Sequence, residues 1–229
     1  MNLSSSEKKN YWKKIQLFEP FLQKILYYNR RKILKIFSKF IKIKKNYTLL
    51  DVGASPIVSM SENMFLKKFR HHKKLSCLSN QDLSPIKKKF NNFSYYLGNA
   101  KKMHFCDNKF DIVHSNATIE HVGSDKYQIQ FIRECLRVSK NKIFISTPYK
   151  YFPIDFHSKI PFLHYFPHSF YSYILKLLGE NFFRFKKNLN LISYQKIVFY
   201  CKKLKIKNYK IVFHRSLFLK SNLILIFNK

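Results

Sequence analysis

Short apolar runs alternate with helical patterns through the central part of the chain. Runs of strand length lie at 48–52, 75–78, 93–97, 109–115 and 142–146. Buried parallel strands are apolar throughout, and crossover helices connect them. Two later runs, 209–214 and 223–227, are separated by eight residues (215–222), too few for a crossover helix, so they must pair in the antiparallel sense. The pattern predicts a mostly parallel sheet that ends in an antiparallel hairpin.

Helical spacing of apolar residues fills the segments between these runs. Before the first strand, residues 8–43 predict a helix in two pieces, with Pro20 restarting the helix in its first turn. Ser84 is the expected N-cap of a short helix whose first residue is Pro85. Further helices are expected over 59–70, 119–138 and 193–204.

The N-terminal helical segment is both basic and amphipathic. A helix of this kind can lie on an anionic membrane or cover the sheet of its own domain, and the second arrangement is the more common. We therefore expect a basic helical extension over residues 1–46 and a main domain over 47–229, in which 148–192 is an inserted lid.

Length and composition limit the class of protein. The 229 residues suffice for one sizeable core, and no apolar run reaches the roughly 18 residues of a membrane span. Residues 1–7 lack the layout of a secretory signal. The cysteines are too scattered for a metal site or a disulfide framework, which predicts reduced, buried thiols at Cys77, Cys106, Cys135 and Cys201. These features indicate a cytoplasmic protein.

The net charge of +32 is unevenly distributed. Residues 1–50 hold 13 Lys and Arg, residues 156–229 hold 14, and nine of the 12 acids lie between Asp51 and Asp155. Compositional bias explains the lysines, while the shortage of acids favours an anionic partner such as a nucleic acid, a membrane surface or a charged glycan. Both interpretations stay open.

Several motifs follow one another along the predicted strands and the segments after them. They are Leu50-Asp51-Val52-Gly53, Gly98-Asn99-Ala100, Phe110-Asp111-Ile112-Val113 with Glu120-His121-Val122, and Arg133 to Val138 followed by Ile145-Ser146-Thr147-Pro148. Across 48–149 this order resembles the class I S-adenosylmethionine-dependent methyltransferases, of the type 11 kind. The resemblance implies a three-layer αβα Rossmann-like fold with a seven-stranded sheet in the order 3-2-1-4-5-7-6, and S-adenosylmethionine as the cofactor.

The resemblance also implies a set of cofactor-binding residues, which follow the ends of the first four strands. Asp82 is the candidate for the ribose hydroxyls and Asn80 the alternative, while Asn99 stands where the family usually has Asp. The family's second glycine is missing after Gly53, so Ser55 or Ser59 would have to supply hydrogen bonds in the first loop. The full set is Asp51, Gly53, Ala54, Ser55, Asn80, Asp82, Asn99, Ala100, Ser115 and Asn116.

Two histidines are the candidates for acid–base chemistry. If the methyl acceptor is a hydroxyl, a base must take its proton, and His121 or His157 has a suitable side chain. Tyr151 and Asp155, in the aromatic segment 148–168, are candidate substrate contacts. A lone histidine is more often a packing or solvated residue, and no metal site is expected.

These observations predict a methyltransferase that acts on a small molecule or glycan, at oxygen. The charge keeps two alternatives open: an RNA methyltransferase, and a non-catalytic basic protein on a methyltransferase scaffold, attached peripherally to the inner membrane surface. A dehydrogenase is disfavoured because the Gly-x-Gly-x-x-Gly turn is absent.

Overall fold

The computed structural model describes residues 5–59, 61–90, 92–216 and 218–229, with side chains described from Pro20 onward. The predicted absence of a secretory signal concerns residues that lie largely outside this range. Within it, no helix is long and apolar enough to cross a membrane.

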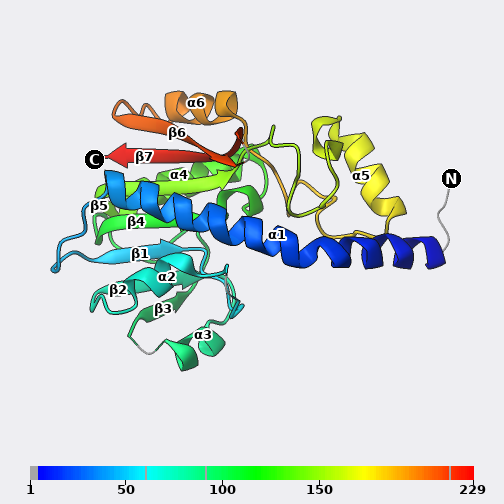
Figure 1. Ribbon diagram of the computed structural model, residues 1–229. Coiled ribbons are helices and arrows are strands. Elements are labelled where there is room, and N and C mark those ends of the chain that lie inside the picture. The colour runs from blue at the N-terminus through cyan, green and yellow to red at the C-terminus, as the bar shows by residue number, and fades with distance from the viewer. Residues whose placement is uncertain (1–4, 60, 91, 217) are drawn as a thin grey trace.

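A seven-stranded sheet forms the centre of the protein, and its order is β3-β2-β1-β4-β5-β7-β6 (Figure 1). Strands β1 to β5 are parallel, and β7 pairs antiparallel with both β5 and β6. The predicted fold class is confirmed. The strands are β1 (Leu49–Val52), β2 (Leu75–Ser79), β3 (Ser94–Leu97), β4 (Phe110–Asn116), β5 (Ser139–Pro148), β6 (Tyr209–Ser216) and β7 (Leu219–Asn228).

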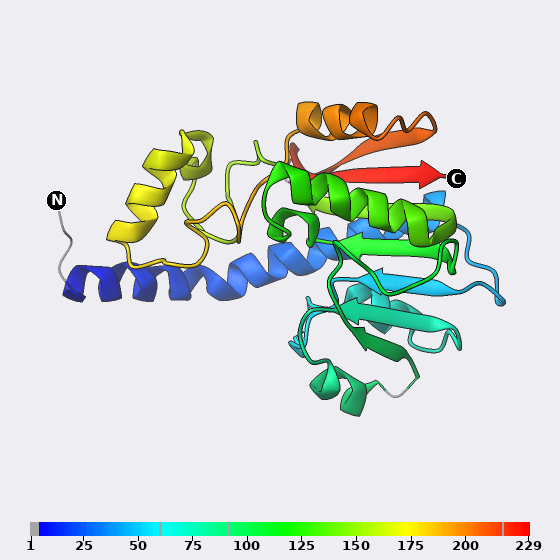
Figure 2. The ribbon, with the colours of Figure 1, turned by 180° about the vertical axis from the view of Figure 1, so that it is seen from behind.

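Helices cover both faces of the sheet and so form the three layers. On one face α1, α2 and α3 pack against alternate strand residues such as Leu49 and Ile112. On the other face α4 and α6 pack against Leu50 and Val113 (Figure 2). The helices are α1 (Ser5–Phe40), α2 (Met64–Phe69), α3 (Ser84–Lys89), α4 (Asp125–Val138), α5 (His168–Leu177) and α6 (Tyr194–Lys203), with short 3-10 turns η1 (Ile119–His121) and η2 (Leu163–Tyr165).

Strand alternation explains this two-sided core. Successive side chains of a strand point to opposite faces, so a fully buried strand needs apolar residues on both. The α1 residues that cover the sheet are Ile33, Leu34, Phe37 and Ile41, all of which are buried. The C-terminal half of α1 therefore belongs to the core of the domain, as the more common of the two expected arrangements requires.

Four local predictions were wrong in detail. Helix α1 is continuous, with Pro20 inside it. Proline removes one backbone hydrogen bond, and the other hydrogen bonds of this 36-residue helix are enough to keep it intact. The helix expected over 59–70 begins only at Met64. The helix expected over 119–138 is divided into η1 and α4 by Gly123, whose φ is +106°. Helix α3 already starts at Ser84, and Leu83 is its N-cap.

The cysteine prediction holds for three of the four residues. Cys77, Cys135 and Cys201 are buried free thiols, whereas Cys106 is exposed. Cys106 lies in the loop between β3 and β4.

A separate small lobe extends beyond the carboxyl ends of the parallel strands. It contains η2 and α5, and its own apolar cluster is formed by Leu163, Tyr171, Leu175 and Leu189. Figure 1 shows this lobe to the right of the sheet, on the side to which β1 and β5 point. The lobe falls within the segment predicted as an insertion, 148–192.

Candidate functional site

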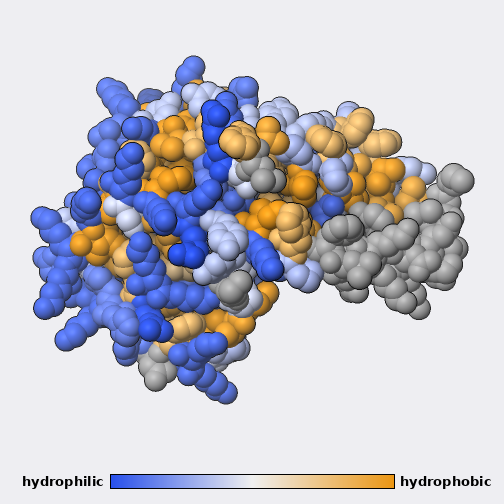
Figure 3. Space-filling view, in the orientation of Figure 1, coloured by the Kyte–Doolittle hydropathy of each residue, from blue (hydrophilic) through white to orange (hydrophobic). Residues whose placement is uncertain are grey.

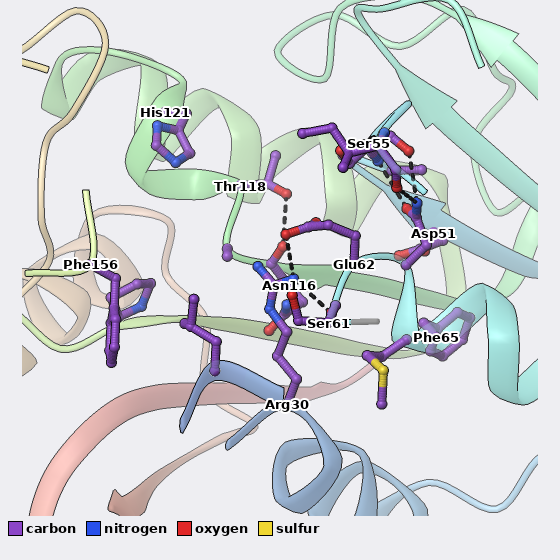
Figure 4. A pocket seen from close by; sticks show the side chains of 18 of the residues that line it. Arg30, Asp51, Ser55, Ser61, Glu62, Phe65, Asn116, Thr118, His121 and Phe156 are labelled. Carbon is purple, nitrogen blue, oxygen red and sulfur yellow. Dashed lines mark hydrogen bonds and ion pairs between the residues drawn. The ribbon is translucent and has the colours of Figure 1, made fainter. Parts of the chain in front are cut away.

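A cleft of about 670 Å³ opens at the carboxyl ends of β1, β2 and β4. Ligands of open α/β sheets bind at this edge, and the volume is in the range of ligand pockets, about 300–1,000 Å³. Helix α1, the loop after β1, the turn after β4 and the lobe segment all contribute to its walls. Figure 4 shows Asp51, Ser55 and Phe65 towards one end, and His121 and Phe156 towards the other.

Gly53 makes the turn that leaves β1. Its φ is +90°, and a Cβ placed there would lie 2.1 Å from Oγ1 and 2.5 Å from Cγ2 of Thr118. Its amide donates to the carbonyl of Leu78 at 2.8 Å, which ties the turn to β2. The positive φ of Gly53 and the close approach of the Thr118 side chain both require glycine at this position.

The loop after Gly53 is fixed by Asn63 rather than by a second glycine. The Asn63 carboxamide accepts from the amide of Ser55 at 3.0 Å and donates to the carbonyls of Ser55 and Ile57, at 2.8 and 3.2 Å. Asn63 itself is left-handed, with φ 52°, which asparagine tolerates better than most residues. The loop therefore forms one wall, and Pro56 and Ile57 line the cleft without closing it.

The serine hydroxyls of this loop are used within the loop. Ser55 Oγ accepts from the amide of Ile57 at 3.2 Å, and Ser59 Oγ accepts from the amide of Glu62 at 3.2 Å. The Ser55 hydroxyl that a ligand would meet is therefore already hydrogen-bonded to the Ile57 amide. The role of Asn63 was missed from the sequence, where it reads as one more polar residue at the start of a helix.

Asp51 pairs with a histidine that sequence reasoning did not select. His114, in the middle of β4, donates from Nδ1 to Oδ1 of Asp51 at 2.7 Å, and both residues are buried. The imidazole stacks on the ring of Phe65, with centroids 4.0 Å apart. Asp51 therefore accepts a hydrogen bond from the His114 imidazole, in addition to lining the cleft.

The remaining cofactor candidates fall into two groups. Gly53, Ala54, Ser55, Asn80 and Asn116 line the cleft together with Asp51. The rest are not among its lining residues: Ser115 is buried and donates to the carbonyl of Val52, Asn99 Oδ1 accepts from the amide of Lys101, and Ala100 packs at the edge of the core.

Asp82 and Asn80 are separated by their position after β2. Strand β2 ends at Ser79, so Asn80 follows it directly and faces the cleft. Asp82 is exposed, and its carboxylate accepts from the amide and the hydroxyl of Ser84 at 3.0 and 2.7 Å. These bonds lower the pKa of Asp82 and hold the start of α3.

The two candidate histidines, which come from distant parts of the chain, are brought together. His121 Nε2 and His157 Nε2 are 3.1 Å apart at one end of the cleft. His121 Nδ1 donates to the carbonyl of Asn188 at 2.8 Å, and His157 Nδ1 donates to Oδ1 of Asp155 at 2.8 Å. Each ring is therefore oriented through Nδ1, with its Nε2 facing the other ring.

Asp155 is a supporting residue of this pair. It is buried, and it also accepts from the amides of His157 and Ser158. Burial opposes charge on both partners, but the attraction between them and their hydrogen bonds prevail, so the pKa of Asp155 is lowered and that of His157 is raised. Tyr151, the other predicted substrate contact, is 46% exposed, packs against Tyr149 and Tyr165, and is not among the lining residues.

Helix α1 contributes a charged residue to the centre of the cleft. Arg30 Nη1 donates to Oε1 of Glu62 at 2.6 Å and to the carbonyl of Ser61 at 2.7 Å. Figure 4 shows Arg30 reaching from α1 towards Glu62. This contact fastens α1 to the loop after β1, and no motif in the sequence pointed to it.

The sequence of residues 60–145 matches the family model described as a methyltransferase domain. No curated protein matches the chain. This match, together with the sheet order, confirms the resemblance to class I S-adenosylmethionine-dependent methyltransferases.

Many solved structures share the fold. A S-adenosylmethionine-dependent methyltransferase from Aquifex aeolicus has a TM-score of 0.57 at 15% identity, with 99% of this chain and 98% of that chain covered. A putative sarcosine dimethylglycine methyltransferase from Galdieria sulphuraria has a TM-score of 0.58 at 14% identity, with coverage of 87% and 84%. Phosphoethanolamine N-methyltransferase 2 of Haemonchus contortus, solved with S-adenosylmethionine, has a TM-score of 0.54 at 16% identity, with coverage of 80% and 38%.

Proposed function

We propose that this protein is an enzyme that transfers the methyl group of S-adenosylmethionine to a hydroxyl of a small molecule or glycan. The observation that carries the proposal is the cleft itself, which joins the Gly53 turn at one end to the paired histidines at the other. The methyltransferase match over 60–145 supports the choice of cofactor.

The residues present fit an adenosylmethionine group. The cleft has the volume for it, and Gly53 lines it in a turn whose positive φ and close approach to Thr118 require glycine. We assign the cofactor to Asp51, Gly53, Ala54, Ser55, Asn80 and Asn116, with Asn80 in place of Asp82 as the partner of the ribose hydroxyls. When bound, this cofactor supplies a methyl group on a positively charged sulfur.

The chain's own contribution is alignment of the acceptor and removal of its proton. Proximity and orientation account for much of the rate enhancement in group transfer. Each ring commits its Nδ1 hydrogen elsewhere, so the two Nε2 atoms, 3.1 Å apart, are the basic positions of the pair and can hold one proton between them. When an acceptor hydroxyl is methylated, its proton would pass to one of these nitrogens.

The lobe segment closes the acceptor end. Phe156, Phe182 and Phe183 line the cleft beside His157, and long loops that form part of a pocket are commonly functional. We assign 148–192 the role of a lid that shapes the acceptor pocket. In this role Asp155 positions His157 rather than contacting the acceptor.

The direct test is equilibrium binding of S-adenosylmethionine to the purified protein, followed by a screen for S-adenosylhomocysteine release with hydroxyl and amine acceptors. Micromolar binding and turnover with a hydroxyl acceptor are expected. A folded protein that fails to bind the cofactor at millimolar concentration would overturn the proposal, and turnover with amines alone would overturn its choice of oxygen.

The charge favours an RNA acceptor as the second candidate. Hydrophilic side chains cover much of the sheet domain in Figure 3, and the formal net charge is +32. Phosphate contacts would make RNA affinity fall steeply with salt. RNA-dependent release of S-adenosylhomocysteine with this salt dependence would replace the small-molecule acceptor by RNA.

A further inference from the structure

We infer that His121, His157 and Glu120 form a binding site for a divalent transition metal ion, with Zn²⁺ as the best-suited cation. Their ligand atoms all lie within 4.8 Å of one another, at the end of the cleft assigned to the acceptor. Two imidazoles and one carboxylate are a donor set that zinc uses in catalytic sites, where a fourth position stays open for water or substrate.

The hydrogen bonds of the two rings place two Nε2 atoms opposite each other, an arrangement that a positive charge between them would stabilise. In their neutral forms both rings carry hydrogen on Nδ1, so two lone pairs face each other across the 3.1 Å between the Nε2 atoms. Two acceptors at this distance repel unless a proton or a cation lies between them. Two nitrogen ligands of one tetrahedral zinc ion are roughly 3.3 Å apart, close to the separation already present.

Glu120 supplies a second and independent indication. Its side chain is fully buried, and Oε1 has no hydrogen-bond partner among the described residues. A buried carboxylate oxygen without a partner is costly, and a bound cation would offset that cost. This oxygen lies 3.9 Å from His121 Nε2, and no two of the three ligand atoms are more than 4.8 Å apart, so shifts of up to roughly 1.5 Å would bring them to zinc spacing.

Each of the three side chains is oriented by a hydrogen bond on the side away from the proposed ion. Asn188 orients His121, Asp155 orients His157, and the hydroxyl of Thr147 donates to Oε2 of Glu120 at 3.0 Å. Ligands of metal sites have such outer partners, which fix the tautomer and direct the free atom inward. These contacts leave Nε2 of His121, Nε2 of His157 and Oε1 of Glu120 directed at one another, and apart from the contact between the two Nε2 atoms none of the three has a hydrogen bond to another described residue.

The role of the metal ion, though not its binding, rests on the proposed function. With the ion bound, the histidines would hold it through Nε2 instead of accepting the hydroxyl proton, and the acceptor oxygen would take the open position. Coordination lowers the pKa of a bound hydroxyl, so its proton would leave to solvent water before methyl transfer. An acceptor with two neighbouring oxygens, such as a sugar diol, would fit this arrangement best.

The test is metal binding to the full chain, measured apart from activity. Protein treated with a chelator and dialysed is titrated with ZnCl₂ by calorimetry, and with CoCl₂ while its visible absorption is recorded. We expect one ion per chain at micromolar affinity, with the intense cobalt bands of four or five ligands. His121→Ala and His157→Ala should abolish binding, and Glu120→Gln should weaken it at least tenfold while preserving shape.

His104→Ala is the matched control, because His104 is exposed and lies outside the cleft. It should bind zinc as the wild type does, and circular dichroism should show that all variants are folded. Zinc binding that survives in the folded double variant His121→Ala/His157→Ala, or no binding by the folded wild type at 100 µM zinc, overturns the inference. Cofactor binding is measured separately, so failure of the methyltransferase proposal would leave a positive zinc result intact.

Discussion

Replacing Gly53 by alanine tests whether the turn after β1 is as constrained as its geometry indicates. The substitution adds two costs. A non-glycine residue at a φ of +90° is strained by about 1–3 kcal/mol. The new Cβ would also lie 2.1 Å from Oγ1 of Thr118, and forcing an added group into a packed site costs about 1–3 kcal/mol more.

Gly123→Ala separates these two costs. Gly123 has a similar φ of +106°, but the tightest contact of a Cβ there is with the Tyr127 ring at 3.3 Å, which can move because Tyr127 is 44% exposed; the Lys187 backbone, at 3.7 Å and beyond, is at ordinary contact distance. We therefore expect Gly53→Ala to lower the free energy of unfolding by roughly 2–6 kcal/mol and Gly123→Ala by about 1–3 kcal/mol.

The assay is urea-induced unfolding of both variants, with calorimetric titration of S-adenosylmethionine on protein that remains folded. Gly53→Ala should also lose at least tenfold in cofactor affinity, whereas Gly123→Ala should keep it. A double variant, Gly53→Ala with Thr118→Gly, removes every Thr118 atom that the Cβ would meet and should recover the steric part. Equal losses in the two single variants, or no recovery in the double variant, would refute the assignment.

Three further predictions concern single residues. Asn80→Ala should lower cofactor affinity about tenfold, the equivalent of one hydrogen bond, while Asp82→Ala should change it less than about twofold; calorimetry showing the reverse would return the ribose role to Asp82. Burial lowers the pKa of His214 from 6.5 to about 4 in the folded protein. As the pH falls, His214 is therefore protonated first in the unfolded chain, and the free energy of unfolding decreases by up to about 3 kcal/mol between pH 6.5 and 4. His214→Gln should flatten that part of the stability profile in urea unfolding, and an unchanged slope would show that other groups cause it. Arg30→Met should lower the free energy of unfolding by about 1–3 kcal/mol and speed proteolysis of residues 53–63, because it removes the 2.6 Å contact with Glu62; a variant as stable and as resistant as the wild type would show that this contact does not hold the loop.

The paired histidines show the limit of sequence reasoning most clearly. His121 and His157 could each be selected by residue type, but they are 36 residues apart in the chain, and nothing local showed that their Nε2 atoms meet. The same holds for Asp51 and His114, which are 63 residues apart. Glu120 was noticed only as part of a motif, because a missing hydrogen-bond partner can be seen only when the surroundings are known.

The sequence by itself determined the sheet, its parallel and antiparallel parts, and the place of the first turn. These follow from local patterns: apolar runs of strand length, connections too short for a crossover, and a glycine after an acid. Only the tertiary structure decided that Asn63 fixes the loop after β1, that Asn80 rather than Asp82 lines the cleft, and that the ligand atoms of Glu120, His121 and His157 lie within 4.8 Å of one another. The physical reason is that periodicity is a property of neighbouring residues, whereas hydrogen-bond partners and burial depend on segments that only folding brings together.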